Sequence, residues 1–227
     1  ERWTVYRCMH CELSWKGSSY VLSNGHWYRV KPYFEEVVDA YFDQIPRHAN
    51  AFMNSKHDSE AAYNIDFCES DPSKLALMDC KNISVGGVHD KVEFCDVYTA
   101  DRCLIHIKRY GSSSVLGHLF NQGLVSGTLL KEHSEFIKKV NEKLPKSHRL
   151  PDSKKVPRDV SGFRIVFAII SESKEPLKIP FFARVTLRHA HRQLFGMNFG
   201  GVELAKIETD DTFAKTQKLR SKGPKPK

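Results

Sequence analysis

The segment from Val92 to Gly123 carries three side chains whose types and spacing suit chemistry on a phosphate: Asp96, His106 and Lys108. Its pattern predicts a strand, a tight turn, a second strand and a helix that opens on serines. A carboxylate and a lysine on neighbouring strands can hold a divalent metal ion and a water molecule beside a phosphate. The lysine adds positive charge where negative charge develops.

The turn between the two strands decides whether these side chains can meet. Alternate residues of a strand share a face, so His106 and Lys108 are expected to point together. Asp96 shares that face only if the turn near Ala100 to Arg102 contains an odd number of residues.

The order of acid, short hairpin, x-Lys and helix resembles the core of the PD-(D/E)xK nucleases, most closely their Mrr-like restriction branch. The resemblance runs from Glu60 to Gln122 and includes a glycine pair before the acid strand. It implies that Glu60 is the helical acid, Asp96 the central acid and Lys108 the lysine. It also implies that Gln122 is the glutamine this branch often carries, and that a divalent ion, Mg²⁺ or Mn²⁺, assists cleavage of phosphodiesters.

One departure from this family concerns His106, because the family has Glu, Asp or Gln two residues before the lysine. A neutral imidazole can ligate a metal ion, but it adds no negative charge and suits ions softer than Mg²⁺. We therefore expect Glu60, Asp96, His106 and Lys108 as catalytic residues and the first three as metal ligands. The rival interpretation is a nuclease-like module that has lost catalysis and binds nucleic acid or docks a partner.

Other assignments of the acids stay open at this stage. Asp79 and Lys81 form a literal D-x-K, and Glu93 replaces Asp96 if the strand register is shifted. Asp96 and Lys108 also fit a plain cross-strand salt pair.

The pair Cys8 and Cys11, with His10 between them, raises a zinc interpretation. A structural zinc site needs four ligands, usually from two such pairs, and only His26 lies near in sequence.

Several polar and basic side chains are candidates for contact with nucleic acid. The serines are expected to cap the following helix with their hydroxyls and to hold a phosphate at its start. The arginines fall at i, i+4 and i+8 of a predicted helix, as a solvated face or a row that follows a phosphate backbone. The candidates are Ser112, Ser113, Gln122, Arg184, Arg188 and Arg192.

Charge and composition favour a polyanionic partner, and the nuclease resemblance implies DNA rather than RNA as that partner. The net charge is +8 over 227 residues, and six basic residues without an acid lie between Lys215 and Lys227. No apolar stretch of about 18 residues occurs, so we expect no membrane span. Six scattered cysteines indicate reduced thiols and a cytoplasmic protein.

The spacing of apolar residues predicts an α/β fold with a mixed central β-sheet flanked by helices. Five strands are expected at 75–78, 92–98, 104–108, 164–170 and 202–207. An N-terminal β-hairpin turning at Asn24-Gly25 and a helix from about Tyr33 precede them. The predicted parts are residues 1–50 (hairpin and helix), 51–208 (nuclease-like domain) and 209–227 (basic tail).

A second resemblance covers most of the chain. The runs LIHIKRYGSSSVLGHLFNQGLVSG and IPFFARVTLRHAHRQL are similar to the C-terminal half of a sporadically distributed family of bacterial proteins whose function is not established. It implies that this chain belongs to a longer protein, with a homodimer contact or a partner engaged through the preceding region. The nuclease resemblance places the activity in antiviral defence or a mobile element.

Overall fold

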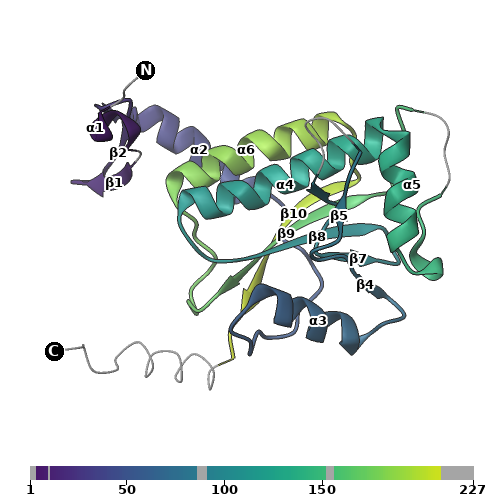
Figure 1. Cartoon of the computed structure of the whole chain (residues 1–227). Helices are drawn as coiled ribbons and strands as arrows, with labels where there is room; N and C mark the ends of the chain where they lie inside the picture. Colours follow the sequence, from purple (N-terminus) through teal and green to yellow (C-terminus); the bar gives the residue numbers. More distant parts are fainter. Residues whose placement is uncertain (1–3, 10, 86–90, 152–155, 211–227) are drawn as a thin grey trace.

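A mixed five-stranded sheet forms the centre of the chain, as Figure 1 shows for the computed structural model. The structure describes residues 4–9, 11–85, 91–151 and 156–210. The order across the sheet is β10 (Gly201–Glu208), β9 (Arg164–Ser171), β8 (Cys103–Arg109), β7 (Val97–Thr99) and β4 (Leu75–Leu77). β8, β9 and β10 run parallel, whereas β7 is antiparallel to both β8 and β4. The predicted fold class is therefore confirmed.

Helices cover both faces of this sheet (Figure 1). On one face lie α4 (Ser113–Glu132), α5 (Ser134–Lys143) and α6 (Phe181–Gly196), and a short 3₁₀ turn (Lys146–His148) follows α5. On the other face lies α3 (Glu60–Ser70), whose Tyr63 packs among Ile105, Ile107 and Val166. Because both faces are covered, β9 is almost wholly buried, which explains its continuous apolar sequence.

Gly123 lets α4 pack directly on the sheet. A Cβ atom at this position would lie 2.4 Å from Phe167 of β9 and 3.3 Å from His106 of β8. Such a contact is far shorter than van der Waals separation, so only glycine allows this approach. Because of this close packing, the part of the sheet that α4 covers is buried.

The turn between β7 and β8 has an odd number of residues, the condition under which Asp96 shares a face with His106 and Lys108. Val97 pairs with Ile105 and Tyr98 with Leu104, which leaves the three residues 100–102 in the turn. Arg102 closes it with a left-handed φ of 64°. Extending the register places Asp96 opposite His106.

The strand expected over Val92 to Tyr98 is divided into two. β6 (Val92–Glu93) pairs with β5 (Asn82–Ile83) in a separate two-stranded ribbon, and β7 joins the main sheet. The residues between them leave the strand geometry, and Asp96 is one of these. Because Asp96 lies outside a strand, its carboxylate can point along the sheet edge toward the backbone of β8.

The N-terminal part forms a three-stranded antiparallel sheet and a helix. The predicted hairpin is confirmed, with Asn24 and Gly25 at φ of 51° and 75°. Its strands β2 (Ser18–Ser23) and β3 (His26–Arg29) are joined by β1 (Cys11–Trp15), which follows the short α1 (Val5–Cys8). The helix α2 (Pro32–Gln44) then packs beside α6. The connecting residues 47–58 run along β10, where Arg47 and Ser55 form bridges with Leu204 and Thr209.

Candidate active site

The strand β8 extends beyond its antiparallel neighbour β7, and side chains complete its hydrogen bonding. The amide of Asp96 donates to the carbonyl of Ile105 at 3.0 Å. Further along, the amide of Ile107 donates to Oδ2 of Asp96 at 2.6 Å, and that of Arg109 donates to Oε1 of Glu60 at 2.9 Å. Two carboxylates thus satisfy backbone donors that β7 leaves open.

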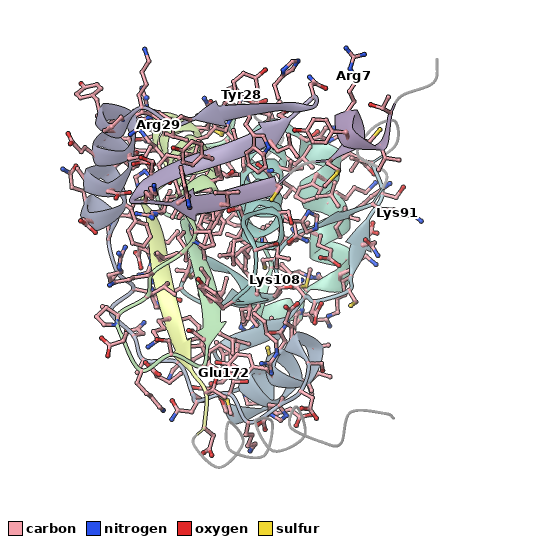
Figure 2. All side chains as sticks on the ribbon, turned by 90° about the vertical axis from the view of Figure 1, so that its left-hand side faces the viewer. Arg7, Tyr28, Arg29, Lys91, Lys108 and Glu172 are labelled. Atoms are coloured by element: carbon pink, nitrogen blue, oxygen red, sulfur yellow. The ribbon has the colours of Figure 1, made fainter. Side chains whose placement is uncertain are left out.

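Glu60 is delivered to this edge by the start of α3. Ser59 caps the helix, because its hydroxyl accepts a hydrogen bond of 3.2 Å from the amide of Ala62. Oε2 of Glu60 accepts a hydrogen bond of 2.7 Å from Nζ of Lys108. The side chains of Lys108 and Glu60 stay 30% and 27% exposed, so solvent and a substrate can reach the pair. Lys108 lies near the middle of the view in Figure 2.

Asp96 is an acid held out of water among other acids. Burial raises the pKa of its carboxyl to about 7 against the hydrogen bond from Ile107, which favours the ionised form. The charges of Asp79, Glu93 and Glu60 raise that pKa further. The group therefore exchanges a proton near neutral pH, and a cation beside it would favour its ionised form.

Lys108 remains protonated at this edge. Burial acts to lower its pKa, but the hydrogen bond and the charge of Glu60 outweigh burial and raise that pKa above the ordinary value. Asp96 and Glu93 add to the increase. The partner of Lys108 is thus Glu60, and the plain salt pair between Asp96 and Lys108 is not the arrangement found.

A second group of potential ligands lies next to Asp96. In the described parts of the chain, one set of three or more His, Cys, Asp or Glu side chains has its ligand atoms within 4.8 Å of one another, and it consists of Asp79, Cys80 and Glu93. Asp79 is joined to Asp96 through the backbone, because its amide donates to the carbonyl of Asp96 at 3.0 Å. Cys80 adopts a left-handed φ of 58°, a strained conformation for a residue with a side chain.

Two amides position the carboxylates of this group. Nδ2 of Asn64, on α3, donates to Asp79 at 3.0 Å, and Nε2 of Gln122, on α4, donates to Glu93 at 3.2 Å. Asn64 is 1% exposed, and its Oδ1 has no hydrogen-bond partner among the described residues. The Oδ1 atom of Asn64 is thus a buried acceptor without a hydrogen bond, which costs about 1–3 kcal/mol of folding free energy.

Within this group, Asp79 and Glu93 offer carboxylate oxygens, and Cys80 offers sulfur from an exposed turn. The hydrogen bond from Cys80 to Asp79, 3.2 Å long, raises the pKa of the thiol. Oxygen ligands suit Mg²⁺ and Mn²⁺, whereas sulfur ligands suit softer ions.

A depression of about 480 Å³ opens beside Glu93. Its lining combines basic, amide and apolar side chains from the β5–β6 ribbon and α4: Asn82, Lys91, Val92, Glu93, His118, Asn121, Gln122 and Val125. Lys91 extends outward at the margin of the molecule in Figure 2. The lining therefore places one cationic side chain beside several amide donors.

His106 lies in the core rather than with the acids. It is 2% exposed, its Nε2 lies 3.3 Å from the hydroxyl of Ser126, and its ring contacts Phe167. Burial lowers its pKa to about 3, so the ring is neutral. Lys108 stands at the end of β8 and reaches Glu60, whereas His106 is covered by α4. The expected set of Glu60, Asp96 and His106 is not brought together as a ligand group among the described residues, and we assign His106 a structural role.

The serines at the start of α4 do not cap it as predicted. Ser112 occupies the N-cap position without a side-chain hydrogen bond to the helix, and its hydroxyl lies 2.9 Å from that of Ser114. The hydroxyl of Ser113 donates to Glu12 of β1. The N-terminal sheet is therefore joined to this end of α4, which the local sequence around the serines could not indicate.

The three arginines of α6 do not form one free row. Arg184 pairs with Asp39 of α2, and the guanidinium of Arg188 lies 5.5 Å from the ring centre of Tyr41. Arg192 is exposed. The docking of α2 thus occupies two of the three side chains expected to follow a phosphate backbone.

The sequence offered partial signals for the remaining residues. Asp79 is the acid of the literal D-x-K and Glu93 is the alternative to Asp96, and the structure brings both close to Asp96. Lys81, the lysine of the D-x-K, instead donates to the carbonyl of Leu77 at 2.6 Å. The role of Asn64 had no local signal, because an asparagine inside a helix is ordinary.

Some predicted features lie outside the described residues, namely the glycine pair 86–87, His10 and the tail from Lys215 to Lys227. The thiols of Cys8 and Cys11 are free. Within the described residues, no helix has the length and the apolar character that spanning a membrane requires.

The fold and the site define an α/β domain with a lysine and a group of carboxylates at one edge of a mixed sheet. Residues 1–208 match the family described as "Family of unknown function (DUF6119)", and the chain belongs to this family. The expected membership of a family without an established function is thereby confirmed. Searches of curated proteins and of solved structures gave no match.

Proposed function

We propose that this chain is a metal-dependent nuclease domain that cleaves DNA phosphodiesters. The observation that carries the proposal is the meeting at one sheet edge of Lys108, paired with Glu60, and the acid Asp96, which Asp79 and Glu93 surround. A lysine beside several carboxylates is the combination that phosphoryl transfer uses to place a metal ion and a positive charge on one phosphate.

Asp79, Cys80 and Glu93 are the residues that would hold the divalent ion, and the neighbouring Asp96 would add a carboxylate beside them. The fit rests on the donor atoms themselves and on the unpaired Oδ1 of Asn64 beside Asp79. A divalent ion bound there would polarise a phosphoryl oxygen and make hydroxide available near neutral pH.

The chain's own side chains supply the remaining chemistry. Lys108 places its ammonium group beside the phosphate once it exchanges Glu60 for a phosphoryl oxygen. Asp96, with its pKa near 7, takes up or releases a proton at that edge. Lys91 and Gln122 line the neighbouring depression and can hold the backbone of the substrate.

The surplus of basic residues supports a nucleic acid as the substrate, and we place DNA before RNA. The net charge is +8, and exposed basic side chains such as Arg192 can contribute phosphate contacts outside the site. The six cysteines are free thiols, which suits a reducing compartment, and we propose the cytoplasm.

Cleavage assays on plasmid DNA and on RNA, each with Mg²⁺ or Mn²⁺, test this proposal. We expect DNA cleavage that Mn²⁺ supports better than Mg²⁺ and that Asp96→Ala abolishes. The control is Lys74→Ala, which changes a lysine whose side chain is 76% exposed. Absence of cleavage under every condition, or equal cleavage by wild type and Asp96→Ala, would refute the proposal.

A second function, binding without cleavage, is favoured by the engagement of Glu60. Both of its oxygens are occupied, one by Lys108 and the other by the amide of Arg109, as in a purely structural ion pair. Under this alternative, DNA affinity in EDTA falls steeply with salt and is unaffected by Asp96→Ala, while no metal supports cleavage.

A further inference from the structure

The N-terminal sheet presents an aromatic face, which we define by Leu13, Trp15, Tyr20, Trp27 and Arg29. In the register of the strands, Leu13 pairs with Tyr20, which pairs with Arg29, and Trp27 pairs with Leu22. Paired residues of an antiparallel sheet share a face, as do residues two apart on one strand. Five side chains from three strands therefore lie on one side of this sheet.

Three large side chains of this aromatic face are exposed to solvent, although Leu22 on the same side of the sheet is 1% exposed. Trp15 is 57% exposed, Trp27 45% and Leu13 40%. The rings of Trp15 and Tyr20 lie 6.3 Å apart in an edge-to-face arrangement. Figure 2 looks onto this end of the molecule, with the three strands in the foreground and Arg29 labelled on β3. Large aromatic side chains gathered in solvent indicate a binding surface rather than a stabilising one.

The charges at this face are positive. Nζ of Lys16 lies 4.5 Å from the ring centre of Trp15, and Nη2 of Arg29 donates to Ser18 at 2.9 Å. The nearby acids are directed elsewhere: Glu12 accepts from Ser113 of α4, and Glu35 accepts from the amide of Ser19. The alternation of β1 also places Glu12 on the opposite side from Leu13 and Trp15.

We propose that the aromatic face binds single-stranded nucleic acid. Exposed rings stack on unpaired bases, and cations between and beside the rings contact the phosphates. A duplex hides its base faces in its own stack, so it cannot use the rings in this way. A second copy of the same face would bring Lys16 and Arg29 against like charges, which disfavours self-association. The proposal extends the proposed function by giving the substrate class an unpaired segment, but it does not depend on cleavage.

Binding of a fluorescently labelled oligodeoxythymidine to the whole chain in EDTA tests the proposal, because cleavage is then suppressed. We expect Trp15→Leu and Trp27→Leu each to weaken binding by roughly tenfold, the usual effect of losing one stacked base. The matched variants Trp15→Phe and Trp27→Phe keep a ring and should retain most of the affinity. Tyr33→Ala, which removes a 76% exposed ring from α2, is the control outside the face.

Two further readouts complete the test. Arg29→Ala should flatten the slope of log affinity against log salt by about 0.7 for each lost phosphate contact. A duplex of the same length should compete poorly. Affinity for the oligomer that is unchanged in the double Trp→Leu variant, at an unchanged melting temperature, would overturn the proposal. It would also be overturned if sedimentation showed that the variant loses a dimer instead, which would make this face a contact between copies. Failure of the nuclease assays alone leaves this result unaffected.

Discussion

The backbone amide of Ile107 donates a hydrogen bond of 2.6 Å to Oδ2 of Asp96, at the point where β7 stops pairing with β8. The bond fixes the carboxylate at the sheet edge and favours its ionised form. Burial and the charges of Asp79 and Glu93 have the opposite effect, and their sum places the pKa of Asp96 at about 7. Because a nearby cation stabilises the ionised form of such an acid, we expect this site to bind a cation.

This balance predicts the pH dependence of stability without metal. Between about pH 4 and pH 7 folded Asp96 keeps a proton that the unfolded chain releases, so its contribution to stability is lost as pH rises through this window. Asp96→Asn keeps an acceptor for the amide of Ile107 and carries no charge. We expect this variant to exceed the wild type in unfolding free energy at pH 8, by at most about 4 kcal/mol.

Urea denaturation in EDTA at pH 4 and at pH 8 measures this effect. The difference between Asp96→Asn and wild type should be small at pH 4 and should grow toward pH 8. A difference of the same size at both pH values would show that the carboxyl of Asp96 does not titrate in this range.

Cys80 is predicted to set the metal preference of the site. Cys80→Ser replaces sulfur by a harder oxygen, so activity with Mg²⁺ should rise relative to activity with Mn²⁺, and Zn²⁺ affinity should fall by roughly tenfold. Calorimetric titrations with the three metals measure this directly. Cys8→Ser, which changes an exposed free thiol on α1, is the matched control. An unchanged order of metal affinities in Cys80→Ser would remove sulfur from the ligand set.

His106 is predicted to contribute stability and not metal affinity. His106→Gln disturbs the contact with Ser126 and the packing on Phe167, and we expect a loss of about 1–3 kcal/mol in unfolding free energy. Manganese affinity, measured by calorimetry below the melting temperature, should stay within about twofold of wild type. A loss of metal affinity as large as that of Asp96→Asn would restore His106 to the ligands.

The arginines of α6 are predicted to separate into two roles. Arg192→Ala should flatten the salt dependence of DNA binding by about 0.9 in slope, because this side chain is exposed. Arg184→Ala should instead lower stability by about 0.5–1 kcal/mol through its contacts with Asp39 of α2. Salt-series titrations and urea denaturation distinguish the two roles. Equal changes in salt slope for both variants would contradict this division.

The secondary structure and the order of the elements were largely predictable from the sequence. The apolar run of β9 and the Asn24-Gly25 turn each carry a local physical signal, and each element is present. The turn between β7 and β8 has an odd number of residues, which is the condition for Asp96 to share a face with His106 and Lys108.

Which residues form the site was less predictable from the sequence, because this depends on where the strands end. A sequence pattern cannot show that the strand holding Asp96 breaks after Glu93, which brings Asp79 and Glu93 to the same edge. His106 lies in the core instead of beside the acids for a related reason. His106 and Lys108 alternate along β8 as predicted. Gly123 lets α4 cover His106, whereas the side chain of Lys108 stays partly exposed.

If Lys108 acts on a phosphate at this edge, its ammonium group controls the single-turnover cleavage rate of one DNA substrate in Mn²⁺. We predict that Lys108→Ala lowers the rate by about 10²–10³-fold, while DNA affinity in EDTA changes by less than about threefold. The exposed-lysine variant Lys74→Ala should cleave at the wild-type rate. A rate for Lys108→Ala equal to that of wild type would show that Lys108 does not act on the phosphate.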